Sequence, residues 1–370
     1  MPKKVLLLYI SEHSGHHSAS TAIEKALHSL DGSVETLNLN SFNYTNPILE
    51  KVINQAYMGV VRSRPEIWDY LYDNPKVLRN TQKLRDMFHR FNTGKLKPLL
   101  DEFAPSAIVC TQAFPCGMVS DYKKSYGLAA PLIGVLTDYA PHSYWMYNNV
   151  DKYIVPSKET GKKLEDNGIE SQKIMPFGIP IESKFSNQNK DGKTLKGELK
   201  LDPCKPCVLV MGGTQGLGPI KDMIRSLDRS TLDIQVVIVC GTNKRLFRWF
   251  DRRHFRKKVV VLSYASNIEE LMQISDLIIT KPGGITTAEA LAKGLPMLII
   301  NPLPGQEAMN TRFLLNEGVA VKAESSADVT VILEELLYNK NKLADMRRKA
   351  LLLSKPSSAT DIARMILEMA

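Results

Sequence analysis

Short apolar runs alternate with helical patterns along much of this 370-residue chain. In the first half these runs occupy residues 5–10, 34–39, 107–110, 131–138 and 150–155. They are rich in Val, Ile and Leu and nearly continuous, which is typical of parallel strands buried on both faces. A helical pattern follows at 157–167, after the fifth run. The first half is therefore predicted to be an α/β domain with a parallel sheet.

The same rhythm restarts in the second half. Strands are predicted at 207–211, 234–240, 259–262, 277–279 and 296–300, with a short helix at 267–274. After residue 307 the remainder is predicted to be helical, with candidates at 332–337, 347–353 and 358–370. Residues 186–203 are polar and lysine-rich and are interpreted as an interdomain linker. We therefore predict domains at 1–185 and 204–345 and C-terminal helices at 346–370, the last of them a candidate for packing back on the N-terminal domain.

Residues 41–103 break this rhythm and look helical, basic and aromatic. Between residues 51 and 100 there are ten Lys or Arg against four acids, interleaved with aromatic side chains. Such a segment can dock on an anionic membrane surface, or it can pack its aromatics inward and leave the charges solvated. Both interpretations stay open here. A second basic run at 244–258 favours an ordinary amphipathic helix over a membrane contact.

Composition narrows the class of protein. The net charge of +9 indicates an anionic partner, but no nucleic-acid recognition module accompanies it. No apolar run approaches the roughly 20 residues that span a bilayer, so we expect a location in the cytoplasm or on the inner membrane surface. The pair Cys204-x-x-Cys207 has no second pair, so no zinc site is expected.

A glycine turn in the second half is the strongest local motif. Residues 281–290 read Lys-Pro-Gly-Gly-Ile-Thr-Thr-Ala-Glu-Ala and join the predicted strand 277–279 to a helix. Glycines there let backbone approach a ligand, and the new helix points free N–H groups and its positive dipole end at it. Glu289 could accept hydrogen bonds from sugar hydroxyls. A second turn at 212–218 is not a P-loop but suits a phosphate cradle.

The first strand-to-helix turn carries histidines. His13, His16 and His17 follow the strand at 5–10, at the sheet edge where ligands bind in open parallel sheets. A histidine there can act as a base because its pKa lies near neutrality. Asp138, His142 and Trp145 follow another strand and form a candidate acceptor or catalytic group; a helix cap and a core Trp are the alternative.

Taken together, these motifs resemble a known family. The stretch 280–290, continued by Pro304-Gly305-Gln306-Glu307 and Asn310, is similar to the donor loops of GT-B diacylglycerol glycosyltransferases. That family includes monogalactosyldiacylglycerol synthases and processive diacylglycerol glucosyltransferases. Thr137-Asp138, His142, Trp145 and residues 149–153 resemble its lipid branch, and Gly15-His16 its Gly-His turn. The implied fold is α/β, with two Rossmann-like doubly wound domains that face each other across a cleft.

The resemblance implies a role for each motif. Uracil would lie near Asn267 and Ile268, Glu289 would accept the ribose hydroxyls, and Gln306 and Glu307 would hold the hexose. The donor diphosphate would rest on backbone of Gly213, Thr214, Gly283, Gly284, Ile285 and Thr286. Backbone dipoles would stabilise the leaving group, so no metal or other cofactor is expected. His142, Trp145, Arg62, Arg64, Trp68 and Arg85 are the candidates for acceptor or membrane contact.

The implied activity is an inverting transfer of a hexose from UDP-glucose or UDP-galactose to the free hydroxyl of 1,2-diacylglycerol. His16 would be the general base, with Asp138 to orient it, although His17 stays an alternative. The product would be a β-glycosyl-diacylglycerol, made by a peripheral enzyme on an anionic phospholipid surface at the inner face of the membrane. A polyprenyl or other glycolipid acceptor, or a non-catalytic nucleotide-sugar sensor, are the alternatives.

Overall fold

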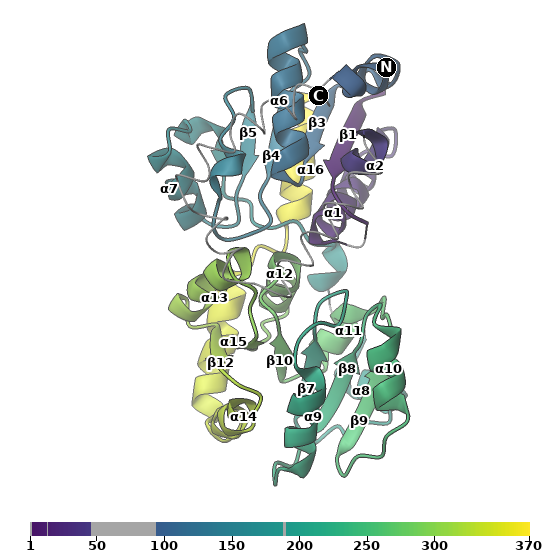
Figure 1. The fold of residues 1–370 in the computed structure, drawn as a ribbon, viewed down its shortest axis with the longest axis vertical. Helices are drawn as coiled ribbons and strands as arrows, with labels where there is room; N and C mark the ends of the chain where they lie inside the picture. Colours follow the sequence, from purple (N-terminus) through teal and green to yellow (C-terminus); the bar gives the residue numbers. More distant parts are fainter. Residues whose placement is uncertain (1, 13, 46–93, 188–189) are drawn as a thin grey trace. The chain divides into compact units, whose positions relative to one another are not determined.

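The structure is a computed structural model that describes residues 2–12, 14–45, 94–187 and 190–370. The chain divides into two compact units, here called unit 1 and unit 2. Unit 1 contains residues 1–183, 304–306 and 357–370, and unit 2 contains residues 184–303 and 307–356. Each unit is built on one six-stranded sheet (Figure 1). Every strand pairing in both sheets is parallel, as the sequence predicts.

In unit 1 the strand order is β2-β1-β3-β4-β5-β6. The strands are β1 Lys4–Tyr9, β2 Glu35–Asn40, β3 Ala107–Cys110, β4 Leu132–Val135, β5 Lys152–Ile154 and β6 Ile174–Met175. The helices are α1 Gly15–Leu30, α2 Ser41–Thr45, α6 Ala113–Tyr126, α7 Lys158–Asp166 and α16 Ser358–Met369, with 3₁₀ turns η1 Ser143–Trp145 and η2 Ser171–Lys173. Residues 94–103 are also helical.

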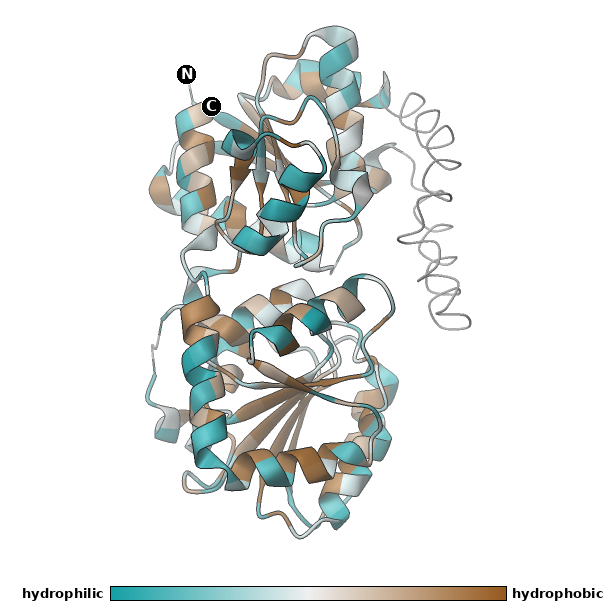
Figure 2. Cartoon of the chain, turned by 90° about the vertical axis from the view of Figure 1, so that its left-hand side faces the viewer, coloured by the Kyte–Doolittle hydropathy of each residue, from teal (hydrophilic) through white to brown (hydrophobic). Residues whose placement is uncertain are grey.

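The core of unit 1 explains why its strands are apolar throughout. Leu6 and Leu8 of β1 pack with α6 on one face of the sheet, and Val5 and Leu7 pack with α1 and α16 on the other. Because successive side chains of a strand point to opposite faces, a sheet covered by helices on both sides needs apolar residues at every position. Figure 2 shows such strands as mostly hydrophobic, next to helices that mix hydrophilic and hydrophobic residues.

In unit 2 the strand order is β12-β11-β10-β7-β8-β9, the doubly wound arrangement of a Rossmann fold. The strands are β7 Cys207–Met211, β8 Gln235–Val239, β9 Lys258–Leu262, β10 Leu277–Thr280, β11 Met297–Ile300 and β12 Ala320–Ala323. The 3₁₀ turn η3 Ser183–Phe185 leads into it. The helices are α8 Gly192–Glu198, α9 Ile220–Arg229, α10 Lys244–Asp251, α11 Ile268–Gln273, α12 Gly284–Ala292, α13 Gln306–Asn316, α14 Asp328–Tyr338 and α15 Lys340–Leu353.

Two local predictions need correction or refinement. The prediction that everything after residue 307 is helical is wrong at β12, which pairs with β11 at the edge of the sheet. This strand has only four residues, two of them half-buried, so it lacks the long apolar run that marks the other strands. The predicted linker 186–203 contains the short helix α8, whose start is capped by Asp191.

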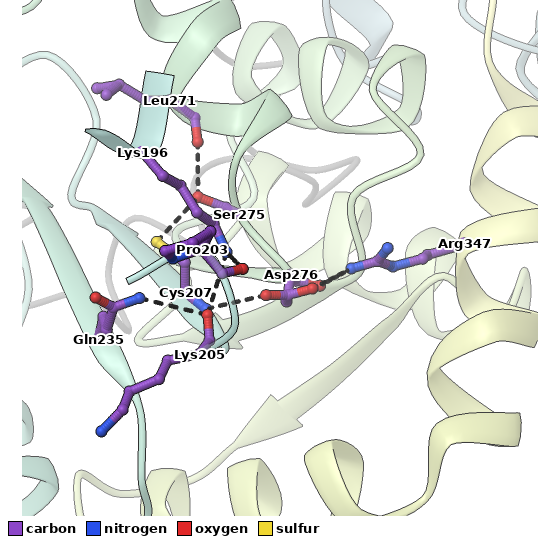
Figure 3. Close-up of polar contacts among 9 residues, drawn as sticks. All are labelled: Lys196, Pro203, Lys205, Cys207, Gln235, Leu271, Ser275, Asp276 and Arg347. Carbon is purple, nitrogen blue, oxygen red and sulfur yellow. Dashed lines mark hydrogen bonds and ion pairs between the residues drawn. The ribbon is translucent and has the colours of Figure 1, made fainter. Parts of the chain in front are cut away.

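A polar cluster holds the amino ends of β7 and β10 together (Figure 3). One carboxylate oxygen of Asp276 accepts a hydrogen bond from the Cys207 amide at 2.9 Å. The other pairs with the Arg347 guanidinium of α15, also at 2.9 Å. Gln235 of β8 bonds the Asp202 backbone in both directions, at 2.6 and 2.8 Å. These contacts lie at the strand ends opposite the glycine turns, so we assign them to stability.

We expect Asp276→Ala to lower the free energy of unfolding of unit 2 by about 1–3 kcal/mol, because it leaves the buried Cys207 amide without an acceptor. Urea denaturation followed by hydrogen exchange of unit 2 peptides would measure the loss. Asp233→Ala is the matched control, since Asp233 forms an exposed ion pair with Lys205. Its expected cost is within about 0.5 kcal/mol. Equal effects of the two substitutions would contradict the assignment.

Candidate functional site

His16 lies at the point where the strand order of unit 1 reverses. The strand β1 pairs with β2 on one side and with β3 on the other, and α1 begins directly after β1 (Figure 1). Loops at such a reversal diverge and leave room for a ligand at the carboxyl ends of the strands. Ser14 caps α1 by accepting a hydrogen bond from the His17 amide. The cap fixes the first turn of the helix, and with it His16.

The ring of His16 is held by residues distant in the sequence. Its Nδ1 atom lies 2.8 Å from the carbonyl oxygen of Thr111, which follows β3, and 3.2 Å from Oγ1 of Thr137, which follows β4. The hydroxyl of Thr111 in turn donates to the carbonyl of His16 at 2.9 Å. A carbonyl oxygen only accepts, so Nδ1 carries the proton of the neutral ring. Nε2 therefore keeps a lone pair that can accept a proton.

The electrostatics of His16 favour the neutral ring. Burial lowers the pKa of its imidazole below the ordinary value, while the Asp138 charge and the Thr111 hydrogen bond oppose this shift. A lowered pKa keeps the ring unprotonated at neutral pH, which a general base requires. Asp138 is half-buried and lies beyond the end of β4 at Val135, so the prediction that it closes the strand is wrong. Its charge acts on His16, and the Thr111 carbonyl and the Thr137 hydroxyl contact the ring at Nδ1.

His17 has a different environment. Its ring stacks on Tyr9 with centroids 4.4 Å apart, and its Nδ1 lies 3.7 Å from a carboxylate oxygen of Glu12. The Tyr9 hydroxyl donates to the other oxygen of Glu12 at 2.8 Å. These contacts hold the His17 ring against residues of the same strand-to-helix segment. They therefore favour His16 as the base. His13 lies outside the described residues.

Two of the predicted acceptor residues, Trp145 and His142, lie within the described part of the chain. Trp145 is 4% exposed and packs in the core of unit 1, and its backbone carbonyl accepts a hydrogen bond from Tyr153 at 2.8 Å. Its burial supports the core alternative rather than a contact with acceptor or membrane. His142 is half-buried and packs against Tyr144 and Trp145. Arg62, Arg64, Trp68 and Arg85 lie outside the described residues.

The two glycine turns of unit 2 follow β7 and β10, the adjacent strands at which its order reverses. In the first turn, Gly212 and Gly216 serve the fold: a Cβ on either would lie 2.2–2.4 Å from backbone oxygens. Gly213 differs, because its φ of +68° needs glycine while nothing lies within 4 Å of a Cβ position. Within the described chain no hydrogen bond uses the Gly213 and Thr214 amides. This turn therefore presents open backbone donors.

The second turn also has a glycine with open space at its Cβ position. Gly283 is the N-cap of α12, with an ordinary φ of −67°, no side-chain capping bond and nothing within 4 Å of a Cβ position. The fold thus does not itself require glycine at 283, whereas a ligand that approaches the backbone would. The amides of Gly284, Ile285 and Thr286 are the first of the helix and lack intrahelical acceptors. They and the helix dipole suit a phosphate group.

Glu307 is fixed in front of the second turn. One carboxylate oxygen pairs with Lys281 at 2.8 Å, and the other accepts the Leu303 amide at 2.7 Å. The Lys281 and Glu307 side chains are only 10% and 17% exposed. Asn310 joins the same loops by donating to the Pro282 carbonyl at 3.0 Å. Each oxygen of Glu307 can still accept a further hydrogen bond. The two contacts therefore fix the orientation of the carboxylate and leave it able to bind a ligand.

The remaining predicted donor residues lie on or next to α11, α12 and α13. Glu289 is half-buried on α12, and Gln306 is half-buried as the first residue of α13. Asn267 precedes α11, and its side chain donates to Glu270 at 2.9 Å, so only its backbone suits the expected uracil contact. Ile268 is half-buried beside it.

Two residues that hold the site were missed in the sequence analysis. Thr111 contacts His16 through its backbone carbonyl, and Lys281 forms an ion pair with Glu307. Neither kind of contact has a sequence motif that would reveal it.

Comparisons with known proteins agree with this architecture. The family model of monogalactosyldiacylglycerol synthase matches residues 16–181, and that of the glycosyltransferase family 28 C-terminal domain matches residues 207–364. A processive diacylglycerol beta-glucosyltransferase of Bacillus cereus is 30% identical over 98% of this chain and 93% of its own length.

Two solved structures show the same fold. The UDP complex of MnaA from S. aureus aligns with a TM-score of 0.66 at 13% identity, over 100% of this chain and 98% of that one. The UDP-glucose complex of HepE from Anabaena aligns with a TM-score of 0.57 at 14% identity, over 99% and 98% of the two chains. The predicted α/β class is thereby confirmed as a GT-B fold.

Proposed function

The chain belongs to the family of diacylglycerol glycosyltransferases, and from this premise we propose that it transfers a hexose from a UDP-sugar to the free hydroxyl of 1,2-diacylglycerol, with inversion. The relatives are named glycosyltransferases, so the chain is an enzyme and not a nucleotide-sugar sensor. The observation that carries the mechanism is the anchored ring of His16, whose Nδ1 faces the Thr111 carbonyl and whose Nε2 is left to take a proton.

The proposed step is a single displacement. The acceptor hydroxyl oxygen attacks the anomeric carbon, its proton passes to Nε2 of His16, and the bond from that carbon to the β-phosphate oxygen breaks. UDP leaves with the electron pair. One displacement at the anomeric carbon turns an α-linked donor into a β-glycoside. The lowered pKa of His16 supports its role because the ring is then neutral when the acceptor arrives.

The leaving diphosphate is proposed to rest on backbone amides. Those of Gly284, Ile285 and Thr286 begin α12 after its N-cap Gly283, and those of Gly213 and Thr214 belong to the turn after β7. Such preorganised donors stabilise negative charge without reorganisation as the bond breaks. We propose that they and the helix dipole serve in place of a metal ion.

The sugar and nucleoside contacts of the donor follow the same elements. Glu289 on α12 is proposed to accept both ribose hydroxyls, and the backbone at Asn267 and Ile268 to bind uracil. Gln306 and Glu307 are proposed to bind the hexose hydroxyls. Lys281 supports this last role by holding Glu307 in one orientation at 2.8 Å.

The acceptor places the enzyme at a membrane surface, as a peripheral protein on the inner face in our proposal. In the described part of the chain, no helix is long and apolar enough to cross a bilayer. Membrane contact through Arg62, Arg64, Trp68 and Arg85 stays a prediction, since these residues are outside the described ranges.

Incubation of the purified full chain with diacylglycerol vesicles and either UDP-glucose or UDP-galactose tests the function. We expect one donor to give a hexosyl-diacylglycerol, identified by mass, with a β anomeric proton by NMR. The same assay with polyprenyl phosphate in place of diacylglycerol tests the other lipid class. An α product would overturn the single displacement, and product from polyprenyl phosphate alone would overturn the acceptor.

We expect Asp138→Asn to move the acid limb of the kcat/KM profile to lower pH. The Asp138 charge raises the pKa of His16, so its removal lowers that pKa further and extends the neutral ring to more acidic solution. A weaker base also lowers the plateau rate. The pH profile is the measurement, with Asp166→Asn on α7 as control because Asp166 forms an exposed pair with Lys162. An acid limb that moves to higher pH would contradict the assignment.

A further inference from the structure

The outer face of α10 and the two residues that follow the helix carry a cluster of cations around one indole, here called the α10 patch. Its members line an open concavity of about 660 Å³ on unit 2: Arg245, Arg248, Trp249, Arg252 and Arg253. The four arginines are exposed and Trp249 is half-buried. Leu246 and Phe250 face the other way and are buried in the core, so α10 is anchored while its basic face stays in solvent.

The indole contacts one arginine of the patch and two cations of α9. The guanidinium carbon of Arg253 lies 3.9 Å from the centroid of the Trp249 ring, and that of Arg225, from α9, lies 4.9 Å away. The ammonium of Lys221 lies at 5.2 Å. Cation–π contacts attract each cation to the ring face, although like charges repel each other. Of the arginines that line the concavity, Arg253 is therefore held against the ring.

Within the described residues, the positive charges of the four patch arginines are not balanced by ion pairs with acidic side chains. Among the described residues, no carboxylate forms an ion pair with Arg245, Arg248, Arg252 or Arg253. The lysines of α7 differ, because Lys162 and Lys163 each pair with an acid four residues away. Clustered, unpaired guanidinium groups favour an anion, and their planar forks match the oxygens of a phosphate.

We propose that the α10 patch binds the phosphate headgroup of an anionic phospholipid, as a contact with the bilayer separate from residues 51–100. The inference rests on the proposed function in one respect, namely that a diacylglycerol acceptor brings the enzyme to a bilayer. Trp249 fits this partner because an indole combines an apolar body with a polar edge and is favoured at the membrane interface. Clustered arginines add attraction to anionic lipid within a Debye length. A single indole provides no row of stacking rings for a nucleic-acid strand.

Vesicle partition of the full chain tests the proposal. Wild type, the variant R245Q/R248Q/R252Q/R253Q and the control K340Q/K342Q/R348Q/K349Q are mixed with vesicles of phosphatidylcholine, with or without phosphatidylglycerol. The control removes the same charge from α15. We expect the α10 variant to partition at least about tenfold more weakly onto the anionic vesicles, with a smaller difference at high salt. Brominated phosphatidylglycerol should quench Trp249 emission, and W249F should lose that component.

Vesicle partition tests the α10 patch, whereas hexosyl transfer in micelles tests the proposed function. Equal partition of wild type and α10 variant, or an equal loss in the control, would overturn the patch. Displacement from vesicles by low millimolar inorganic phosphate would overturn it in favour of a soluble phosphate. A fluorescent oligonucleotide is titrated against the same proteins, and a loss of its binding in the α10 variant without a loss of vesicle binding would replace the membrane by a nucleic acid. Hexosyl transfer to diacylglycerol in neutral detergent micelles should be equal in wild type and α10 variant; absence of transfer in wild type would refute the function, not the patch.

Discussion

His16→Ala is expected to lower kcat by at least about two orders of magnitude, with little change in the affinity for UDP. General base catalysis typically contributes about 10²–10⁴-fold, and the variant has no group at Nε2 to take the acceptor proton. The loss falls on kcat because the diphosphate and uridine contacts are assigned to other residues. Initial rates of hexosyl-diacylglycerol formation and calorimetric binding of UDP would measure the two effects.

His17→Ala is the matched control for this experiment. His17 is the next residue of the same helix, but it stacks on Tyr9 and faces Glu12. We expect a change in kcat of less than about threefold and a small loss of stability. If His17→Ala abolished turnover and His16→Ala did not, the assignment of the base would be reversed.

The pH profile gives a second criterion for His16. Because burial lowers its pKa, the ring stays neutral as the pH falls below the ordinary value of about 6.5. Activity should therefore persist below pH 6.5 and fall only as the lowered pKa is reached. This acid limb should disappear from the residual activity of His16→Ala. An identical limb in the variant would assign the titration to another group.

Glu289→Ala is expected to raise the dissociation constant of UDP and the KM for the donor by roughly 10²-fold. Hydrogen bonds to a charged group contribute about 1.5–3 kcal/mol each, and the proposed carboxylate accepts two from the ribose. The effect on kcat should be smaller, because the ribose does not take part in bond breaking.

A donor analogue sharpens this prediction. Wild type should discriminate strongly between UDP and 2′-deoxy-UDP, and Glu289→Ala should bind the two with nearly equal affinity. Glu317→Gln is a suitable control, since Glu317 is an exposed acid just beyond α13. If Glu289→Ala still bound UDP more tightly than 2′-deoxy-UDP, another group would be responsible for binding the ribose 2′-hydroxyl.

Sequence patterns predicted the local elements of both units well. Strands such as β3 and β7 were located to the residue, and α16 within one residue of its end. Their periodicity is decided by short-range geometry and by burial on both sheet faces. The edge strands β6 and β12 were missed, because runs of only two and four residues carry too little apolar signal.

By itself the sequence determined the strand–turn–helix order, the glycine turns, the position of Glu289 and a family resemblance that the relatives confirm. Only the tertiary structure decided which side chains meet. Residues 95 positions apart along the chain join at His16 and Thr111, because parallel strands bring their carboxyl ends to one edge. The Lys281–Glu307 pair, the burial of Trp145 and the cations of α9 around Trp249 arise in the same way. Such contacts depend on strand order and helix packing, which local periodicity does not encode.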